Sequence, residues 1–305
     1  MGVQKISITH SSENDKRNQD VKININGRLF HRDKASISVF DSGFLLGDGI
    51  WEGLRLNNKK WVFFDEHMER LYDTLKAVEI EFALTPSEIL GELEKTRLEN
   101  SMETDAYARL MITRGKKSKA FQHPAFSIYG PTFVIILEHS KPVLRQSAKG
   151  VKLVTVPQTR GSPLVQDPKY NSHSKLNCVI ACLQSSKAGG DEALMLDPHG
   201  FVSTTNSCNF FIVRKKEVWT STGDYCMNGV TRSKVIEICK DVGIPVLEKN
   251  FSLFETYAAE EAFLTGTFGG ITQVSSIDGH KIGLGEEGVV VSKLRNHYEA
   301  MIGKS

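Results

Sequence analysis

The sequence lacks the features that mark several specialised classes of protein. It has no charge bias, because 38 Lys and Arg residues stand against 36 Asp and Glu residues and leave a net charge of +2. Such a small net charge argues against nucleic acid or an anionic membrane surface as a partner. No apolar run approaches the roughly 18 residues that a membrane-spanning helix needs. Residues 1–20 have no apolar signal core, and we expect a polar leader there.

Cysteine is also scarce, and its spacing shows no paired pattern. The five cysteines form an odd set without the repeated spacing of a disulfide framework or a zinc site. Cys178 and Cys182 lie four residues apart on a predicted helix, where we expect them to be core thiols. We therefore predict a reducing, cytoplasmic setting and no metal site.

The length and composition indicate a globular chain with more than one core. The 305 residues are 40% hydrophobic and 24% charged, and a chain of this length usually divides into two domains. The polar, proline-containing stretch 140–150 is the predicted linker. It separates a small N-terminal domain, residues 21–139, from a larger C-terminal domain, residues 151–305.

The N-terminal half alternates strand and helix signals. Asn26-Gly27 predicts a hairpin, and glycines at 43, 47, 49 and 53 indicate either a tight connection or a loop close to a ligand. In the second case Trp51 and Arg55 would face a pocket. Asp65 is the expected cap of a helix whose apolar stripe is Met68, Leu71, Leu75 and Val78.

Arg70 lies at the edge of that apolar stripe. It is either a surface residue or an arginine that reaches inward for a phosphate group. A second amphipathic helix is predicted for residues 86–100. The strand 105–115 that follows places Tyr107 and Arg109 on one face, which is either solvated or in contact with a ligand. We expect the lysines of the next loop to be solvated: Lys116, Lys117 and Lys119.

The stretch from Pro168 to Asn209 predicts a strand, a helix, a strand and a polar turn. If residues 169–175 form a strand, Lys169, Asn171 and Lys175 share one face. The helix 176–186 presents apolar residues that should hold this strand in place: Val179, Ile180 and Leu183. Further along, a predicted helix starts at Thr231 after Gly229, and a helix start of this kind offers free backbone N–H groups to a phosphate.

Several motifs occur together in a characteristic order. They are GDGIWEGLR, HMERL, YAR, GGDEALMLDPHGFV, the NFF strand, NGVTR and TGTFGGIT. In order and spacing they resemble the class IV aminotransferases, which include the branched-chain and D-amino-acid aminotransferases and aminodeoxychorismate lyase. The resemblance covers roughly residues 22–302 and implies the fold-type IV architecture. This is a two-domain α/β homodimer, with a small N-terminal α/β sandwich, a larger C-terminal pseudo-barrel, and pyridoxal 5'-phosphate held between the domains.

The resemblance also implies roles for particular residues. The residues expected to bind the cofactor phosphate are Arg70, Val230, Thr231 and Thr267. The residues expected near the substrate are Trp51, Arg55, Tyr107, Arg109 and Phe268. The carboxylate clamp of the D-amino-acid type, an arginine and a histidine two residues apart, is not evident after Arg114.

Two positions depart from the family pattern. In an ungapped alignment, Asn171 stands at the position of the lysine that forms the Schiff base, and Lys175 falls on a tyrosine position. A gapped alignment puts Lys175 on the lysine position, so Lys175 is the predicted nucleophile and Lys169 is second. Thr204 replaces the glutamate expected beside the pyridine nitrogen, which predicts a weaker electron sink. Asn171 and Thr204 are both expected to lie against the cofactor.

The predicted function is the transfer of an amino group between an amino acid or amine and a 2-oxo acid. An alternative within the family is a lyase of the aminodeoxychorismate type. A second alternative is a degenerate homologue that binds pyridoxal phosphate or another phosphorylated ligand without transamination. Asn171 and Thr204 favour the degenerate homologue, whereas Arg70, Thr231 and Lys175 favour the enzyme.

Overall fold

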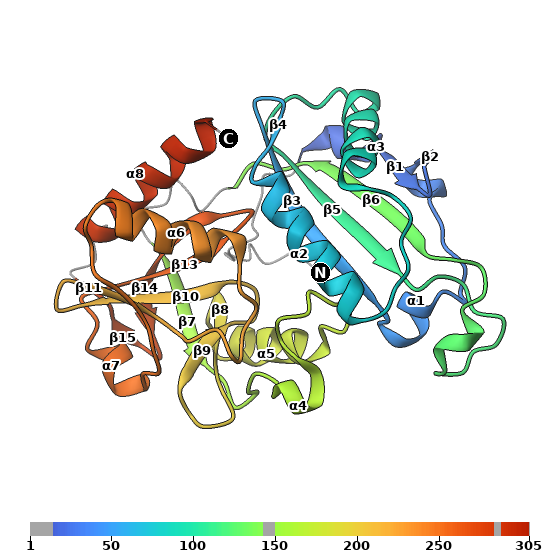
Figure 1. Ribbon diagram of the computed structural model, residues 1–305. Coiled ribbons are helices and arrows are strands. Elements are labelled where there is room, and N and C mark those ends of the chain that lie inside the picture. The colour runs from blue at the N-terminus through green and yellow to red at the C-terminus, as the bar shows by residue number, and fades with distance from the viewer. Residues whose placement is uncertain (1–14, 143–149, 284–287, 305) are drawn as a thin grey trace. The chain divides into compact units, whose positions relative to one another are not determined.

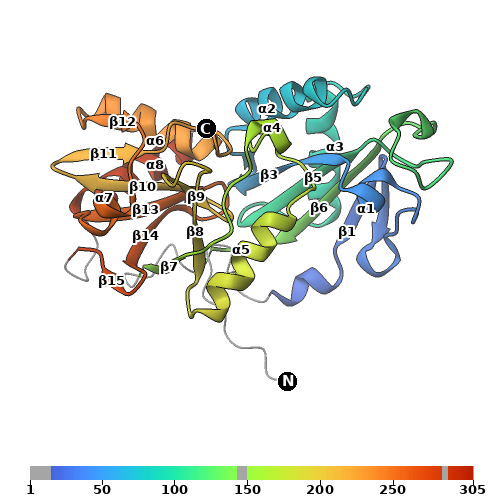
Figure 2. The same cartoon turned by 90° about the horizontal axis from the view of Figure 1, so that it is seen from below.

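The computed structural model describes residues 15–142, 150–283 and 288–304 (Figures 1 and 2). These residues form two compact units. The N-terminal unit comprises the described part of Glu13–Lys141 together with Tyr170–Lys175. The C-terminal unit comprises the described part of Pro142–Lys169 and Leu176–Lys304. Residues 1–14 of the predicted leader and 143–149 of the predicted linker lie outside the described residues, so these boundaries stay predictions.

The N-terminal unit is built on an antiparallel sheet. Its described strands have the order β2-β1-β6-β5-β3-β4. Asn26 and Gly27, both with positive φ, form the predicted turn between the first two strands. The elements are β1 (Lys22–Ile25), β2 (Arg28–His31), α1 (Ser42–Leu46), β3 (Gly49–Asn57), β4 (Lys60–Trp61), α2 (Phe64–Ala77), α3 (Pro86–Glu99), β5 (Ala106–Thr113) and β6 (Thr132–His139).

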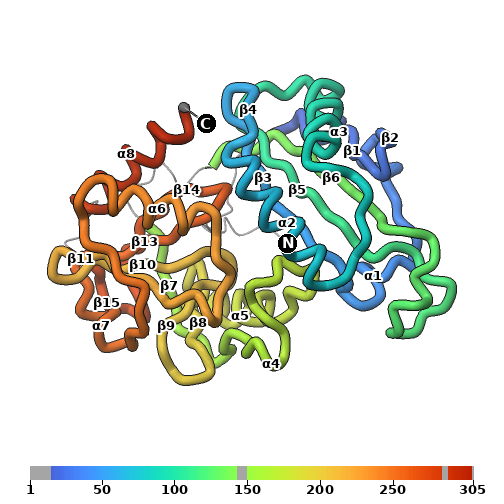
Figure 3. The backbone as a smooth tube through the Cα atoms, in the orientation of Figure 1, coloured from blue at the N-terminus to red at the C-terminus, as the bar shows by residue number. Residues whose placement is uncertain are grey.

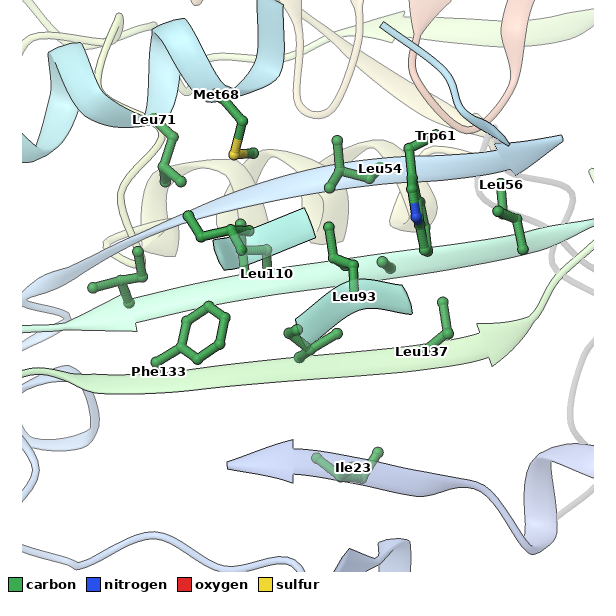
Figure 4. Close-up of a cluster of buried hydrophobic side chains, with 14 of the residues drawn as sticks. Ile23, Leu54, Leu56, Trp61, Met68, Leu71, Leu93, Leu110, Phe133 and Leu137 are labelled. Atoms are coloured by element: carbon green, nitrogen blue, oxygen red, sulfur yellow. The ribbon is translucent and has the colours of Figure 1, made fainter. Parts of the chain in front are cut away.

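Helices α2 and α3 cover one face of this sheet, and the core of the unit lies beneath them. Figure 4 shows Met68 and Leu71 of α2 and Leu93 of α3 among side chains of the strands, and each of the three is at most 2% exposed. Met68, Leu71 and Leu75 of the predicted stripe are therefore confirmed as core residues, whereas Val78 is partly buried and follows the last residue of α2. Its predicted cap is wrong, because the helix already starts at Phe64 and has no side-chain cap bond. In α3 the residues Thr85 and Glu88 form a capping box.

One lysine of the loop after β5 is not solvated as expected. Lys117 is 1% exposed, and its Nζ donates to the His123 carbonyl and to Ser127 Oγ, at 3.2 Å each. A bridge between Lys117 and Ser127 folds the loop back on itself and buries the long side chain. Lys116 and Lys119 are exposed, as predicted.

The C-terminal unit is built on a larger mixed sheet, traced in Figure 3. Its described strands have the order β12-β11-β10-β13-β14-β7-β8-β9, with β15 beside β14. The elements are β7 (Val151–Thr155), α4 (Pro163–Gln166), α5 (Leu176–Lys187), β8 (Glu192–Leu196), β9 (Val202–Thr205), β10 (Asn209–Arg214), β11 (Glu217–Thr220), α6 (Val230–Asp241), β12 (Val246–Glu248), α7 (Leu253–Tyr257), β13 (Glu261–Gly266), β14 (Gly270–Ile277), β15 (His280–Lys281) and α8 (Val289–Lys304).

This sheet closes on itself. Strand β9 pairs with β8 along its length and also with β10 at a single position, Thr204 opposite Asn209. The pairings β10–β13, β13–β14, β14–β7, β7–β8 and β8–β9 complete the ring. The interior is apolar and includes Val151, Leu194 and Leu264, each at most 1% exposed. Thr204, one of the two residues of this closing pair, is also one of the residues predicted to lie against the cofactor.

Two expectations for the stretch around Lys175 are wrong. Residues 169–175 do not form a regular strand, since only Ser172 makes a bridge, to Ile50. The helix α5 is present, but its apolar stripe faces outward, with Val179 51% and Leu183 55% exposed. Small residues allow the other face of α5 to pack closely, and Ser185 Oγ donates to the Glu192 carbonyl at 2.9 Å.

The two cysteines of α5 also differ from expectation. Cys178 and Cys182 are half-buried rather than core thiols, whereas Cys208, Cys226 and Cys239 are buried. All five cysteines are free. Within the described ranges, no helix combines the length and apolarity needed to cross a membrane. The same residues include no group of three His, Cys, Asp or Glu side chains placed to hold a metal ion.

Candidate functional site

A cluster around Trp51 gathers several predicted site residues in the N-terminal unit. We call Trp51, Arg109, Asn171 and Lys175 the Trp51 cluster. The Arg109 guanidinium lies 3.8 Å from the centre of the Trp51 ring, and Lys175 Nζ lies 5.9 Å from it. Cations over an indole face are attracted by its quadrupole. An arginine and a lysine that are far apart in sequence thus both lie close to one indole ring.

Main-chain pairing with the edge of β3 positions Lys175. The Trp51 N–H donates to the Asn171 carbonyl at 2.9 Å, and Asn171 Nδ2 donates back to the Trp51 carbonyl at 2.6 Å. Trp51 Nε1 donates to the Ser172 carbonyl, and the His173 N–H donates to the Gly49 carbonyl at 2.8 Å. A Cβ on Gly49 would lie 2.8 Å from His173 Nδ1, so this close approach requires glycine. Asn171 therefore anchors the segment through its side chain and its backbone.

Arg55 and Tyr107 lie on the same sheet face as Trp51. The register pairs Arg55 with Tyr107 and Gly53 with Arg109 on β3 and β5. The Tyr107 hydroxyl occupies the space above Gly53, because a Cβ there would lie 1.9 Å from Tyr107 Oη. The alternation of these strands thus brings the predicted substrate residues of the N-terminal unit onto one face, opposite the core under α2 and α3.

Arg70 projects from α2 toward a buried carboxylate, Glu52, on the core side of the sheet. Arg70 Nε and Nη2 bond to Glu52 Oε1 and Oε2 at 2.8 and 2.7 Å, and His67 Nδ1 lies 2.7 Å from Glu52 Oε2. Burial by itself raises the pKa of Glu52, but Arg70 and His67 outweigh it and lower the pKa to about 2. This group was missed from sequence. The signal was a glutamate among the inward positions of an apolar strand.

In the C-terminal unit, polar side chains gather where the ring of strands closes. Thr204 pairs with Asn209, and Asn209 pairs with Thr265 on the neighbouring strand β13. Thr204 Oγ1 donates to the Cys208 carbonyl at 2.7 Å. Thr265 is 2% exposed, and its Oγ1 has no hydrogen-bond partner among the described residues. A buried hydroxyl without a partner marks a position suited to a polar ligand.

The start of α6 lies beside the same strand ends. Gly229 caps this helix without a side-chain bond to the first-turn N–H groups. A Cβ on Gly229 would lie 2.4 Å from Asn209 Oδ1, so glycine lets the helix start approach Asn209. Thr231 Oγ1 lies 3.4 Å from Tyr298 Oη of α8. The uncapped amides of Val230 and its neighbours, with the positive end of the helix dipole, suit an anion.

Thr267 and Phe268 lie in the turn between β13 and β14, directly after Thr265 and Gly266. Phe268 is 5% exposed, whereas Thr267 is partly exposed. Lys169, the second choice for the nucleophile, is exposed and belongs to the C-terminal unit. The structure therefore groups the predicted residues of each unit separately: Trp51, Arg55, Tyr107, Arg109, Asn171 and Lys175 in one, and Thr204, Val230, Thr231, Thr267 and Phe268 in the other.

Comparison with known proteins agrees with the resemblance seen in the sequence. The family model for amino-transferase class IV matches residues 49–277. The chain is 38% identical over 277 residues to branched-chain-amino-acid aminotransferase-like protein 2 of Arabidopsis thaliana, covering 91% of this chain and 49% of that protein. It is 35% identical over 280 residues to a putative branched-chain-amino-acid aminotransferase of Methanocaldococcus jannaschii, covering 92% and 96%.

A solved structure shows the same fold. The branched-chain amino acid aminotransferase of T.th., complexed with N-(5'-phosphopyridoxyl)-L-glutamate, matches with a TM-score of 0.85 at 27% identity, covering 94% of this chain and 95% of that one. The chain thus belongs to the class IV aminotransferase family, and the predicted fold class is confirmed. It spans about half the length of the two Arabidopsis thaliana relatives that it matches.

Proposed function

We propose that this chain is a pyridoxal-phosphate-dependent aminotransferase that moves an amino group between an amino acid or amine and a 2-oxo acid. The observation that carries the proposal is the Trp51 cluster, in which a lysine amine and an arginine lie against one indole ring. The chain belongs to the class IV aminotransferases, and this membership supports the interpretation of the lysine as a catalytic amine. The phosphopyridoxyl compound bound to the T.th. enzyme supports the choice of cofactor.

The residues of the C-terminal unit fit the phosphate group of this cofactor. The start of α6 offers uncapped N–H groups at Val230 and Thr231, and glycine keeps the approach open. Thr265 adds a buried hydroxyl that has no partner within the described residues, and Thr267 lies two residues further along the turn. We assign the phosphate to this helix start. Arg70, the other predicted phosphate ligand, uses Nε and Nη2 for Glu52.

Lys175 is the proposed nucleophile and proton carrier. The cofactor, when bound, supplies the electron sink that makes the Cα–H bond of the substrate acidic. The Lys175 amine would hold the cofactor covalently and, once released, would carry the proton from and to Cα. We assign Arg109 and Tyr107 to the substrate carboxylate, because a guanidinium and a phenol hydroxyl both donate hydrogen bonds to it. Trp51 would fix the position of Lys175 and Arg109, and Arg55 and Phe268 complete the proposed substrate residues.

Thr204 and Asn171 are the two departures from the family pattern. They affect the expected strength of the electron sink but leave Lys175 as the proposed nucleophile. The Thr204 hydroxyl donates its hydrogen bond to the Cys208 carbonyl, so it would present a neutral oxygen to a ring nitrogen. A neutral group holds a proton on that nitrogen less well than a carboxylate does. Asn171 already binds the Trp51 carbonyl and supports the segment that carries Lys175. We therefore expect transamination with a weaker electron sink than a carboxylate provides.

The first test is an absorption spectrum of the protein mixed with pyridoxal phosphate, followed by borohydride reduction and peptide mapping. We expect a reduced adduct on Lys175 and loss of amino transfer in Lys175→Ala. Lys169→Ala is the matched control, since Lys169 is an exposed lysine six residues away, and it should keep both. An adduct on Lys169 would preserve the enzyme assignment but move the nucleophile. Reversible binding without an adduct would identify a degenerate homologue.

A donor and acceptor screen then separates the reaction types. An aminotransferase releases a 2-oxo acid only when a second 2-oxo acid is present to receive the amino group. A lyase of the aminodeoxychorismate type releases product without an acceptor. Dependence of product formation on the acceptor would support the proposal, and product formation that is independent of the acceptor would contradict it.

The chain is also proposed to form a homodimer. Large apolar side chains are exposed along one stripe of α5, with Leu176 70%, Val179 51% and Leu183 55% exposed. Such a stripe favours a protein partner. We expect light scattering to give twice the 34.0 kDa of one chain and Leu183→Lys to reduce it. Phe254→Lys, at another exposed apolar position on α7, should not. A wild-type mass of one chain would refute the dimer.

The five free cysteines support the predicted location. Free thiols persist in a reducing compartment such as the cytoplasm. Fractionation of cells that express the full chain tests this location, and recovery in an oxidising compartment would contradict it.

A further inference from the structure

A buried arginine in the C-terminal unit has no anionic partner among the described residues, although such a group normally has one. Arg160 is 7% exposed, and its backbone N–H bonds to the Leu196 carbonyl. Its guanidinium contacts a thiol, with Nη1 donating to Cys178 Sγ at 3.0 Å. Arg160 Nε is buried and has no hydrogen-bond partner in the part of the chain that the structure describes. A buried cation is costly unless an anion or strong acceptor compensates it.

The surroundings of Cys178 distinguish this thiol from the other four. Cys178 lies in the first turn of α5, is half-buried, and its Sγ also donates to Asn177 Oδ1 at 3.2 Å. The start of a helix and a guanidinium both stabilise negative charge on sulfur. Cys182, one turn further along α5, is half-buried too, but burial and then Glu192 raise its pKa. The same helix thus carries an internal control thiol.

We propose that Cys178 is a site of oxidation by hydroperoxides, with the Arg160 guanidinium as the group that stabilises the sulfur before and after the reaction. In the reaction with hydrogen peroxide, the Cys178 sulfur attacks one peroxide oxygen. An S–O bond forms and the O–O bond breaks. Sulfur is oxidised by two electrons, the peroxide is reduced, and the departing oxygen takes the thiol proton to leave as water. The product is a sulfenic acid, whose oxygen accepts a hydrogen bond from Arg160.

The test treats the full chain with hydrogen peroxide in the presence of a dimedone probe that traps sulfenic acids, followed by peptide mapping at early times. We expect the adduct on Cys178 to form about tenfold or more faster than any adduct on Cys182, the size of effect that one hydrogen bond to a charged group gives. This comparison is made within the unaltered protein and needs no variant. An adduct that forms equally fast or faster on Cys182 would overturn the proposal.

Variants then test the role of Arg160. Arg160→Met should slow labelling of Cys178 by about tenfold, and Arg160→Lys, which keeps the positive charge, should restore part of the rate. Cys178→Ser should remove the adduct, and Cys182→Ser should leave the rate at Cys178 unchanged. A folded Arg160→Met protein labelled at the rate of the unaltered chain would also overturn the proposal. If that variant does not fold, the comparison of Cys178 with Cys182 decides.

Discussion

Removing the charge of Glu52 should destabilise the N-terminal unit strongly. Glu52 is 1% exposed and bonds to both Arg70 and His67. Its pKa is lowered from 4.5 to about 2, a difference that corresponds to about 3 kcal/mol of stability at neutral pH. Removing one partner of a buried ion pair costs about 3–5 kcal/mol in other proteins. We therefore expect Glu52→Gln to lower the free energy of unfolding by about 3 kcal/mol at pH 7.

The stability difference between the original chain and Glu52→Gln should also depend on pH. A carboxyl whose pKa is depressed by folding contributes its full stability above the unfolded pKa, near 4.5, and loses it as pH falls toward the folded value of about 2. The stability difference between the original chain and Glu52→Gln should therefore be largest above pH 5 and shrink as the pH falls below 4.5. Urea unfolding followed by circular dichroism at several pH values measures it.

A matched surface variant provides the control. Glu99 pairs with Lys22 at 2.6 Å, but both side chains are about half exposed. Solvent screens such a pair, so Glu99→Gln should change stability little. Our explanation of the Glu52 group would be refuted if Glu52→Gln unfolded at the same urea concentration as Glu99→Gln at pH 7. A stability difference that stayed constant down to pH 3 would refute it too.

Three further predictions follow from close contacts and burial. Gly53→Ala should displace the hydroxyl of Tyr107, because the added Cβ would lie 1.9 Å from it; kcat/KM for amino transfer should fall, and the assignment of Tyr107 to the substrate would be wrong if it did not. Gly229→Ala would place a Cβ 2.4 Å from Asn209 Oδ1, so affinity for pyridoxal phosphate, measured by absorbance titration, should weaken. Burial raises the pKa of Cys239 to about 12; its thiol should resist a thiol reagent at pH 8 until urea unfolds the chain, and labelling in the folded state would contradict this.

Local patterns in the sequence predicted much of the fold. The Asn26-Gly27 turn needs only positive φ at two neighbouring residues, and the helix predicted for residues 86–100 is present as α3, Pro86–Glu99. The apolar stripe of α2 is a periodic signal within one helix. Alternation along β5 likewise separated Tyr107 from the core positions. In each case the residues that matter are near neighbours along the chain, or they recur with the period of a single helix or strand.

The candidate site depends on contacts between residues far apart in sequence, which hydrophobic periodicity does not predict. Asn171 bonds to Trp51 across 120 residues, and this pairing at the edge of β3 holds Lys175 without a regular strand. A strand pattern was predicted there because alternating residues look alike whether or not a partner strand is present. The partner of Arg70, Glu52, was missed for a similar reason, since their contact joins a helix to a strand.

The sequence by itself thus determined the family, through seven motifs in a fixed order, and the helices and strands whose signals are local. Only the tertiary structure decided that Thr204 meets Asn209 where the ring of strands closes, that α5 turns its apolar stripe outward, and that Arg160 reaches Cys178. The physical reason is that propensity and periodicity act over a few residues. Pairing register, ring closure and burial of a charge are settled by which distant segments pack together.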